Sequence, residues 1–172
     1  MSKPKPPKKV KLTASLIGSD KGIIRQILPV LQDRFGDIDF ISERMEFHHT
    51  EYYYGEMGGN LFRKIVSFDT LIDPEMLPEI KIQTNFLEDD YADNGRRKIN
   101  IDPGYIAMEK MVIASCKNFA HRIYLAKGVY ADLTLIYKGR SFQPLEWTFP
   151  DYAEEGMRNL LNSLRERYIY CR

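Results

Sequence analysis

The order of strand-like and helix-like segments in the first 102 residues constrains the fold more than any single motif does. Alternating apolar side chains indicate strands, and apolar side chains at intervals of three and four indicate helices. The strand-like segments are 10–18, 37–47, 60–69 and 97–102, and the helix-like segments are 19–36 and 73–94. The resulting order, β-α-β-β-α-β, is typical of the split βαβ arrangement of ferredoxin-like sheets. We therefore predict an α+β fold built on this core.

Local signals mark the ends of both helices. Asp73 followed by Pro74 combines a capping carboxylate with a proline at the first helical position. In the first helix, Asp20 can cap the start and Gly36 suits the end. Pro29 lies inside this helix, where a proline removes a hydrogen bond and crowds the preceding turn, so we expect a kink or a late start.

The second half of the chain extends this core with a β-hairpin or meander and a C-terminal helix. We predict a short helix near 106–115, strands near 121–125, 129–137 and 140–147, and a last helix from 151. Asp151 and Glu154 have the spacing of a capping box, and the helix has a buried stripe of Met157, Leu160, Leu161, Leu164 and Tyr168. We find no internal repeat and no linker, so we expect one domain over 10–172 behind a flexible Lys- and Pro-rich tail at 1–9.

The composition excludes several classes of protein. A chain of 172 residues with 44% hydrophobic and 28% charged residues is typical of a globular protein, not a disordered one. The net charge of +1 gives no strong electrostatic case for nucleic acid over the whole chain. Cys116 and Cys171 form no CxxC motif, which indicates a reducing, cytoplasmic compartment. We find no signal peptide and no run of about 18 apolar residues, so we expect no membrane partner.

Residues 121–134 can form a hairpin whose register decides which side chains share a face. A three-residue loop at 126–128 pairs Arg122 with Asp132, Tyr124 with Tyr130 and Leu125 with Val129. A two-residue loop would instead mix apolar and charged side chains on both faces, so we predict the first register. It separates an apolar face (Ile123, Leu125, Val129, Ala131 and Leu133, with His121) from a polar face (Arg122, Tyr124, Tyr130, Asp132 and Thr134).

The polar face of the hairpin has two interpretations. Arg122 with Asp132 can be an ordinary cross-strand ion pair, and Tyr124 with Tyr130 an ordinary aromatic pair. Alternatively, Arg122 and Lys127 hold an anion while the tyrosines stack on a planar ligand. A turn at 138–139 would place Trp147 beside Tyr130. Further candidates for this ligand site are Tyr53, Arg63 and His48.

Few residues are candidates for catalysis. His121 or His48 could act as a general base with Asp102 as its partner. We favour plainer roles, a core position for His121 and a helix cap for Asp102 before Pro103. A metal site at His48 and its neighbour is disfavoured, because adjacent side chains of an extended chain point in opposite directions. The sequence has no phosphate loop, dinucleotide fingerprint, HExxH motif or nucleophile elbow, and no cofactor follows from it.

Several motifs occur together over roughly residues 10–155. They are TEYY at 50–53 with EMG at 56–58, LIDP at 71–74, IK at 80–81 with TN at 84–85, NIDPGY at 100–105, HRIYL at 121–125 and WTFPDY at 147–152. In this combination the chain resembles a prokaryotic family, the domain-of-unknown-function 4416 family. The resemblance implies a single cytoplasmic domain and gives no residue a catalytic role. Some members carry a GTP-binding label, but this sequence has neither a phosphate loop nor an Asn-Lys-x-Asp motif.

Three functions are compatible with these observations. The first is a binding module that holds a phosphate-bearing ligand, a nucleotide or RNA, on the polar face of the hairpin. The second is a small phosphoester hydrolase that uses His121 or His48 with Asp102. The third is a protein-interaction or assembly domain with a Tyr-rich surface, because Tyr, Trp and Arg are enriched in interfaces.

Overall fold

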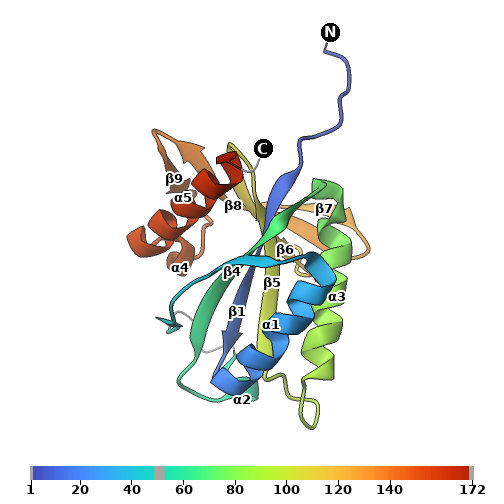
Figure 1. Cartoon of the computed structure of the whole chain (residues 1–172), viewed down its shortest axis with the longest axis vertical. Helices are drawn as coiled ribbons and strands as arrows, with labels where there is room; N and C mark the ends of the chain where they lie inside the picture. Colours follow the sequence, from blue (N-terminus) through green and yellow to red (C-terminus); the bar gives the residue numbers. More distant parts are fainter. Residues whose placement is uncertain (1, 49–52, 171–172) are drawn as a thin grey trace.

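A computed structural model describes residues 2–48 and 53–170, which form a nine-stranded antiparallel sheet with helices on both faces (Figure 1). The main path of the sheet is β2-β4-β1-β5-β6-β8-β7, with β3 beside β4 and β9 beside β8. The strands are β1 (Val10–Gly18), β2 (Ile38–Ile41), β3 (Met45–Glu46), β4 (Phe62–Ile72), β5 (Ile99–Ile106), β6 (Lys110–Ser115), β7 (Arg122–Ala126), β8 (Val129–Lys138) and β9 (Ser141–Pro144).

Two long helices cover one face of the sheet, and a third long helix covers part of the other. In Figure 1, α1 and α3 lie across the front of the sheet, and α5 lies beside β8 and β9. The helical segments are α1 (Lys21–Phe35), α2 (Tyr54–Met57), the 3-10 turn η1 (Pro74–Met76), α3 (Leu77–Asp90), α4 (Pro150–Ala153) and α5 (Glu155–Tyr170).

The central strand β1 is buried over its whole length, but its two faces differ. Leu12, Ala14 and Leu16 pack in the core beneath α1 and α3. Because side chains alternate along a strand, Thr13 and Ser15 point to the opposite face. On that opposite face, one part is closed by α5, through a core of Ile65, Ile106, Met111, Leu135, Phe142, Met157, Leu161 and Leu164. The remaining part of that face is polar.

The predicted elements of the first half are largely confirmed. α1 begins directly after Asp20, which accepts a hydrogen bond from the Gly22 amide, and it ends at Gly36. The late start that Pro29 suggested is therefore wrong. The single strand predicted over 37–47 is also wrong, because β2 and β3 are separate short strands that both pair with β4.

The segment after Asp102 differs most from its prediction. β5 continues through Asp102, Pro103 and Gly104, and β6 occupies the region predicted as a helix at 106–115. Asp102 therefore caps no helix. Pro103 is tolerated because its missing N–H points to the edge of β5 away from β1, and β6 pairs with β5 only from Gly104.

The predicted capping box at the last helix is wrong as well. Asp151 lies in the short helix α4 and pairs with Arg63 on β4. Glu154 has an extended backbone that separates α4 from α5. The predicted buried stripe of α5 is confirmed at Met157, Leu161, Leu164 and Tyr168, and Leu160 is partly buried.

The hairpin of β7 and β8 has the predicted register but a different loop. Arg122 faces Asp132 and Tyr124 faces Tyr130, as expected, but the pairing of Leu125 with Val129 is wrong. A two-residue turn with positive φ at Lys127 and Gly128 joins the strands, and a bulge near Leu125 restores the register.

The apolar face predicted for β7 is not buried. Ile123 is 70% exposed and Leu125 39%, because no helix covers this outer strand. The prediction for Trp147 is also wrong. Its ring stacks on His121, and its indole N–H donates to the Leu133 carbonyl.

Candidate ligand-binding cleft

A cleft of about 730 Å³ lies on the polar face of the sheet, between the strands and the segment that leads into α4. Its walls come from six strands, from α3, from the loop after β6 and from α4. The charged residues that line it are Arg63, Lys81, Arg97, Lys117 and Arg122, with Glu88, Asp89, Asp102, Asp132 and Asp151.

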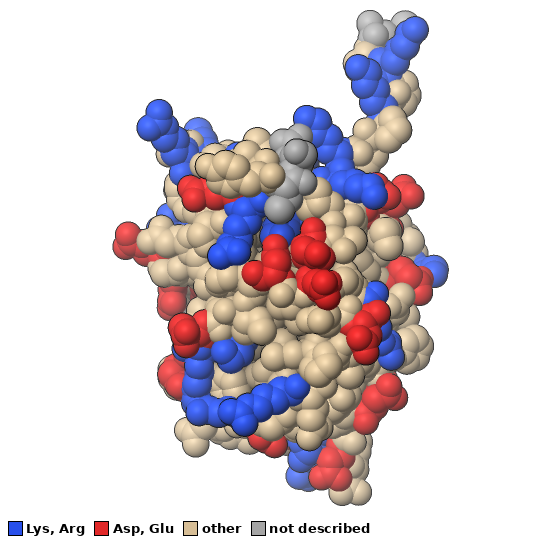
Figure 2. Space-filling view, viewed as in Figure 1, with Lys and Arg blue, Asp and Glu red and all other residues tan. Residues whose placement is uncertain are grey.

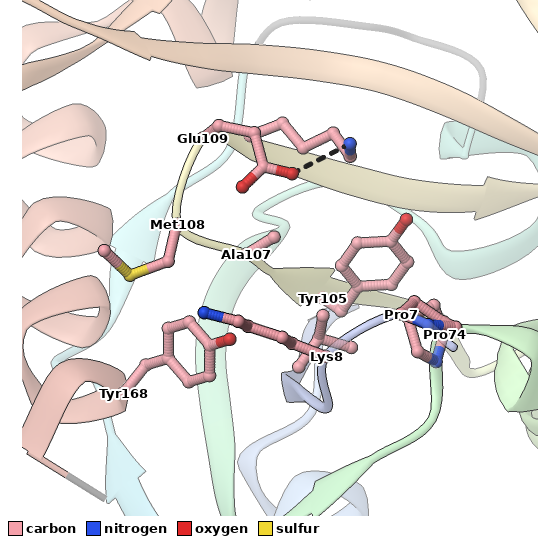
Figure 3. A pocket seen from close by; sticks show the side chains of 10 residues that line it. Pro7, Lys8, Pro74, Tyr105, Ala107, Met108, Glu109 and Tyr168 are labelled. Carbon is pink, nitrogen blue, oxygen red and sulfur yellow. Dashed lines mark hydrogen bonds and ion pairs between the residues drawn. The ribbon is translucent and has the colours of Figure 1, made fainter. Parts of the chain in front are cut away.

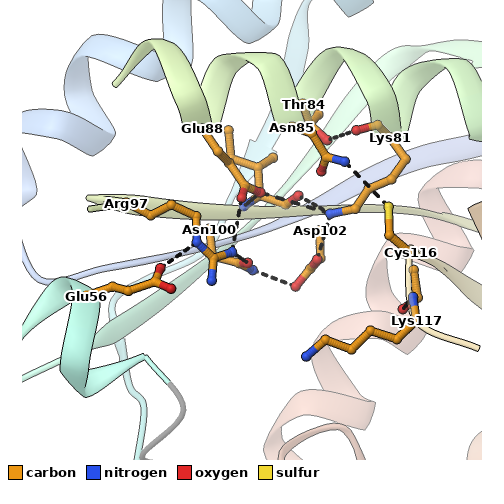
Figure 4. Close-up of polar contacts among 12 residues, drawn as sticks. Glu56, Lys81, Thr84, Asn85, Glu88, Arg97, Asn100, Asp102, Cys116 and Lys117 are labelled. Atoms are coloured by element: carbon orange, nitrogen blue, oxygen red, sulfur yellow. Dashed lines mark hydrogen bonds and ion pairs between the residues drawn. The ribbon is translucent and has the colours of Figure 1, made fainter. Parts of the chain in front are cut away.

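The cleft is open at its centre because two neighbouring strands separate. β5 pairs with β6 only at Gly104, Tyr105 and Ile106, so the preceding residues of β5 have a free edge on that side. Side chains of α3 form hydrogen bonds with the backbone groups at this edge. The Ile101 amide donates to Glu88 at 2.7 Å, and the Ile101 carbonyl accepts from Lys81 at 3.0 Å (Figure 4).

Lys81 and Asp102 form the central ion pair of the cleft. Lys81 Nζ lies 3.0 Å from Asp102 Oδ1, and Asn100 donates to Asp102 Oδ2 at 2.6 Å. Burial acts to raise the pKa of Asp102, but the Lys81 ammonium and the Asn100 amide outweigh it, so this pKa is lowered. Burial acts to lower the pKa of Lys81, but Asp102 and Glu88 together raise it. Both groups therefore remain charged, and Asp102, whose side chain is 30% exposed, faces the cleft.

The carboxylates of Glu56 and Glu88 hold Arg97 at one end of the cleft. Arg97 donates to Glu56 at 2.6 Å and to Glu88 at 3.3 Å, and these carboxylates raise its pKa against the effect of burial. The Arg97 guanidinium also lies 5.7 Å from the centre of the Tyr53 ring. Burial, followed by the Asp102 charge, raises the pKa of Tyr53, so its hydroxyl keeps its proton.

Arg63 lies in the floor of the cleft between two aromatic rings. Its guanidinium carbon is 4.7 Å from the ring centre of Phe47 and 4.9 Å from that of Tyr152. Nη2 pairs with Asp151 at 2.5 Å, while the buried Nε–H has no hydrogen-bond acceptor in the described part of the chain. Burial opposes the charge, but the neighbouring Asp151 helps to keep the pKa of Arg63 above its ordinary value.

Arg122 and Asp132 lie at the other end of the cleft. Arg122 Nε donates to Asp132 at 2.8 Å, and Nη1 donates to the Ser115 hydroxyl and to the Lys117 carbonyl. The guanidinium lies 4.6 Å from the centre of the Phe119 ring. These contacts fix the guanidinium against the wall, so the cross-strand ion pair predicted from the sequence is also part of the cleft.

The predicted ligand-binding residues divide into two groups. Arg63, Tyr53, Arg122 and Asp132 all line the cleft. Three others lie outside its lining. Tyr124 and Tyr130 form an edge-to-face pair with ring centres 5.4 Å apart, and Lys127 pairs with Glu79 of α3.

The predicted catalytic residues are not brought together. Asp102 partners Lys81, whereas His121 Nε2 lies 3.2 Å from Asp132. His121 stacks between Phe119 and Trp147 with its side chain 18% exposed, so the core position favoured for it is wrong. His48 is exposed, and its neighbour at 49 lies outside the described residues. Within residues 2–48 and 53–170, no group of three or more His, Cys, Asp and Glu side chains is arranged to hold a metal.

Four residues of the polar network were missed by sequence reasoning. Lys81 and Glu88 lie seven positions apart on α3, each next to a residue of its buried stripe. Arg97 precedes β5, and Asn100 lies within it. The signal that could have revealed them is the polar alternation of Lys11, Thr13 and Ser15 in β1 with Asn100 and Asp102 in β5, because these side chains share one face.

A smaller cavity of about 310 Å³ lies beneath the N-terminal segment, between β5, the turn before β6 and α5 (Figure 3). Tyr168 closes one side by donating to the Lys9 carbonyl at 2.7 Å, and Glu109 pairs with Lys110 at the rim. This cavity contains none of the predicted site residues.

In the described part of the chain, no helix has the length and apolar character that a membrane span requires.

Comparisons with known proteins place the chain in a family without assigning an activity. Neither a search of curated proteins nor a search of solved structures gave a match. The profile of one family, described as a domain of unknown function (DUF4416), matches residues 8–168. This match covers nearly the whole chain, from just before β1 almost to the end of α5. The chain therefore belongs to the DUF4416 family.

Proposed function

We propose that the cleft binds a small ligand with one phosphate group and a planar ring, of the size and chemistry of a mononucleotide. This places the phosphate-bearing ligand predicted from the sequence in the cleft instead of on the outer face of the hairpin. Four of the predicted ligand-binding residues line this cleft.

The observation that carries the proposal is the unsatisfied hydrogen-bond donor of the buried Arg63 side chain. A guanidinium has five N–H donors; Nη2 of Arg63 pairs with Asp151, but its buried Nε–H has no acceptor in the described part of the chain. A buried donor without an acceptor is costly unless a ligand or water satisfies it nearby. Phe47 and Tyr152 hold the guanidinium between their rings, so its orientation is set before a ligand arrives. Such a preorganised fork can donate to two oxygens of a phosphate.

The charge balance of the cleft favours one phosphate over a polyanion. Five basic residues and five acidic residues line it, so their formal charges cancel. A single phosphate carries about −1.5 to −2 charges and leaves the carboxylates to accept hydrogen bonds from sugar or base. Figure 2 shows the face that α1 and α3 cover, and there too basic and acidic side chains occur in small groups, without the continuous basic stripe that RNA binding uses.

The volume and the aromatic rim fit a ligand of this size. Ligand pockets commonly measure about 300–1,000 Å³, and the cleft of about 730 Å³ lies in that range. Phe119 and Phe149 line it and are 51% and 53% exposed. Exposed aromatic rings at the mouth of a polar cleft can stack on a nucleobase.

We also infer that the core is a ferredoxin-like split βαβ unit within one domain over residues 10–172. The strand order β2-β4-β1-β5 supports this inference. β1, β2, β4 and β5 are the first to fourth strands of the β-α-β-β-α-β unit, so its first and third strands lie at the centre. Both helices of the unit, α1 and α3, contribute to the same core cluster.

The proposal is tested by calorimetric titration of the chain with nucleoside monophosphates and with inorganic phosphate. We expect saturable binding that weakens about tenfold or more in Arg63→Lys, because lysine keeps the charge but lacks the planar fork. Arg44→Lys is the matched control, since Arg44 also lies over a ring (Phe62, 4.5 Å) and pairs with Glu46 but does not line the cleft.

Two results would contradict the proposal. One is equal binding by wild type and Arg63→Lys, with circular dichroism showing that both are folded. The other is the absence of binding by any monophosphate. Tighter binding of a single-stranded RNA than of any mononucleotide would show that the ligand is a polyanion and that the charge argument is wrong.

A further inference from the structure

The outer strand β7 presents an exposed apolar edge. It pairs with β8 on one side only and forms the end of the main sheet path. Its three central residues, Ile123, Tyr124 and Leu125, are 70%, 58% and 39% exposed. Exposed edges of this kind are templates for pairing with another strand, and proteins commonly protect them with charges, bulges or covering segments.

Other free strand edges in this fold are capped by side chains from helices. On β9, the Phe142 amide donates to Asn162 Oδ1 at 2.9 Å, and the Phe142 carbonyl accepts from Arg158 at 3.4 Å. Both capping residues belong to α5. The backbone of β9 is thereby satisfied on the side away from β8.

The same device occurs on β5 and β2. Glu88 and Lys81 of α3 cap the Ile101 amide and carbonyl on the free edge of β5. On β2, the Asp39 carbonyl accepts from Arg167 of α5 at 3.5 Å. A capped edge offers fewer free groups to a second strand, so these three edges are closed to pairing at the capped positions.

β7 has no such side-chain cap, and its one irregularity is the bulge near Leu125. Among the described residues, no side chain hydrogen-bonds to the backbone of Arg122–Ala126, and the only turn contact is from the Arg122 amide to the Phe119 carbonyl. The strand therefore combines an uncapped backbone edge with its most exposed apolar side chains. The contrast with β9, β5 and β2 indicates an edge that pairs with another strand.

We propose that β7 pairs antiparallel with β7 of a second copy of this chain, which joins the two sheets across a two-fold axis. A pairing centred on Tyr124 places Ile123 against Leu125 of the partner subunit and Tyr124 against its own equivalent. Arg122 then faces an alanine, so no like charges oppose each other in the strand. A two-fold interface must be complementary to itself, and this strand meets that condition.

The low net charge also suits self-association. With a net charge of +1, two copies repel each other only weakly. A partner that bound through charge would instead need a strand edge of one sign, but the three exposed residues at the centre of β7 are all uncharged. Main-chain hydrogen bonds and apolar contacts are the interactions that this edge offers.

Sedimentation over a concentration series tests this pairing. We expect a monomer–dimer equilibrium in the wild type, with dimerisation weakened about tenfold or more in Ile123→Lys, because an edge lysine disfavours strand pairing. The matched control is Ile41→Lys, which places the same charge at a 44% exposed isoleucine on β2, an outer strand at the opposite end of the sheet. This control should dimerise like the wild type.

Hydrogen exchange gives a second readout that needs no variant. The amide of Tyr124, which lies on the free edge, should become more protected as the protein concentration rises, while those of β2 should not. A wild type that stays monomeric up to about 1 mM would overturn the proposal. A dimer that persists in Ile123→Lys, or concentration-dependent protection on another surface only, would also overturn it.

Discussion

The two faces of β1 carry the same degree of burial and opposite chemistry. Toward α1 and α3 the strand presents Leu12, Ala14 and Leu16, which belong to one apolar cluster. Toward the other face it presents Thr13 and Ser15, which are equally buried. Burying polar groups lowers stability unless hydrogen bonds compensate, so a fold that needed only stability would have made both faces apolar. In the function proposed above, one face provides stability and the other binds the ligand.

The polar face retains stability because its charges are paired. Lys81 with Asp102, Arg97 with Glu88 and Arg63 with Asp151 each join a cation to a carboxylate within 3.3 Å. Breaking a buried pair costs more than the pair contributes, because the remaining charge loses its partner. Substitutions on the two faces should therefore differ in kind: apolar ones should change stability alone, and polar ones should also change binding or pH dependence.

The largest expected effect comes from Leu16→Ala on the apolar face. Leu16 is fully buried, and removing its side chain leaves a cavity between β1 and the helices. We expect the free energy of unfolding to fall by about 3 kcal/mol, measured by urea denaturation. Binding of a monophosphate by the folded variant should be unchanged. A loss below about 1 kcal/mol would mean that the apolar face does not dominate stability.

A smaller and pH-dependent effect is expected from Asp102→Asn on the polar face. The folded pKa of Asp102 is lowered, so its ionised form contributes stability above the ordinary carboxylate pKa of about 4. This contribution is lost as the pH falls through the lower folded pKa. At pH 7 we expect the variant to be less stable by about 1 kcal/mol, since the side chain is partly exposed.

The measurement for Asp102→Asn is urea denaturation at pH 7 and at about pH 3, where the difference from wild type should shrink. Asp33→Asn, at an exposed position of α1, controls for the loss of a carboxylate elsewhere. A constant difference at both pH values would contradict the pairing with Lys81. Glu88 should act with the opposite sign, because burial raises its pKa and its charged form is disfavoured in the folded state.

Most strands and helices of the fold were predictable because their signals are local. The capping Asp20 and the terminal Gly36 mark α1, and apolar alternation marks β1. The errors arose where a local signal had two meanings. Asp102 before Pro103 is a good helix start in sequence, but it continues a strand because the free edge of β5 needs no N–H at Pro103.

The site was predictable only in part, because tertiary contacts decide it. Arg63 and Arg122 were identified from their neighbours in sequence, but they line one cleft only because β4 and β7 belong to one sheet. Lys81 and Glu88 could not be separated from an ordinary solvent-exposed helix face. They are buried because the edge of β5 beside them is unpaired, and no sequence pattern on α3 records that fact.

The smallest expected effect, from Lys127→Ala, tests whether the outer face of the hairpin belongs to the site. Lys127 is exposed and, within the described part of the chain, pairs only with the exposed Glu79, a type of contact that contributes little to stability. It does not line the cleft, so the variant should bind monophosphates with the affinity of the wild type and unfold at the same temperature. Arg122→Ala, only five positions away, should weaken binding because its guanidinium forms the cleft wall. Calorimetry on both variants separates the two surfaces. If Lys127→Ala weakens binding as much as Arg122→Ala does, the ligand lies on the hairpin, and the polar face of the sheet is not the binding site.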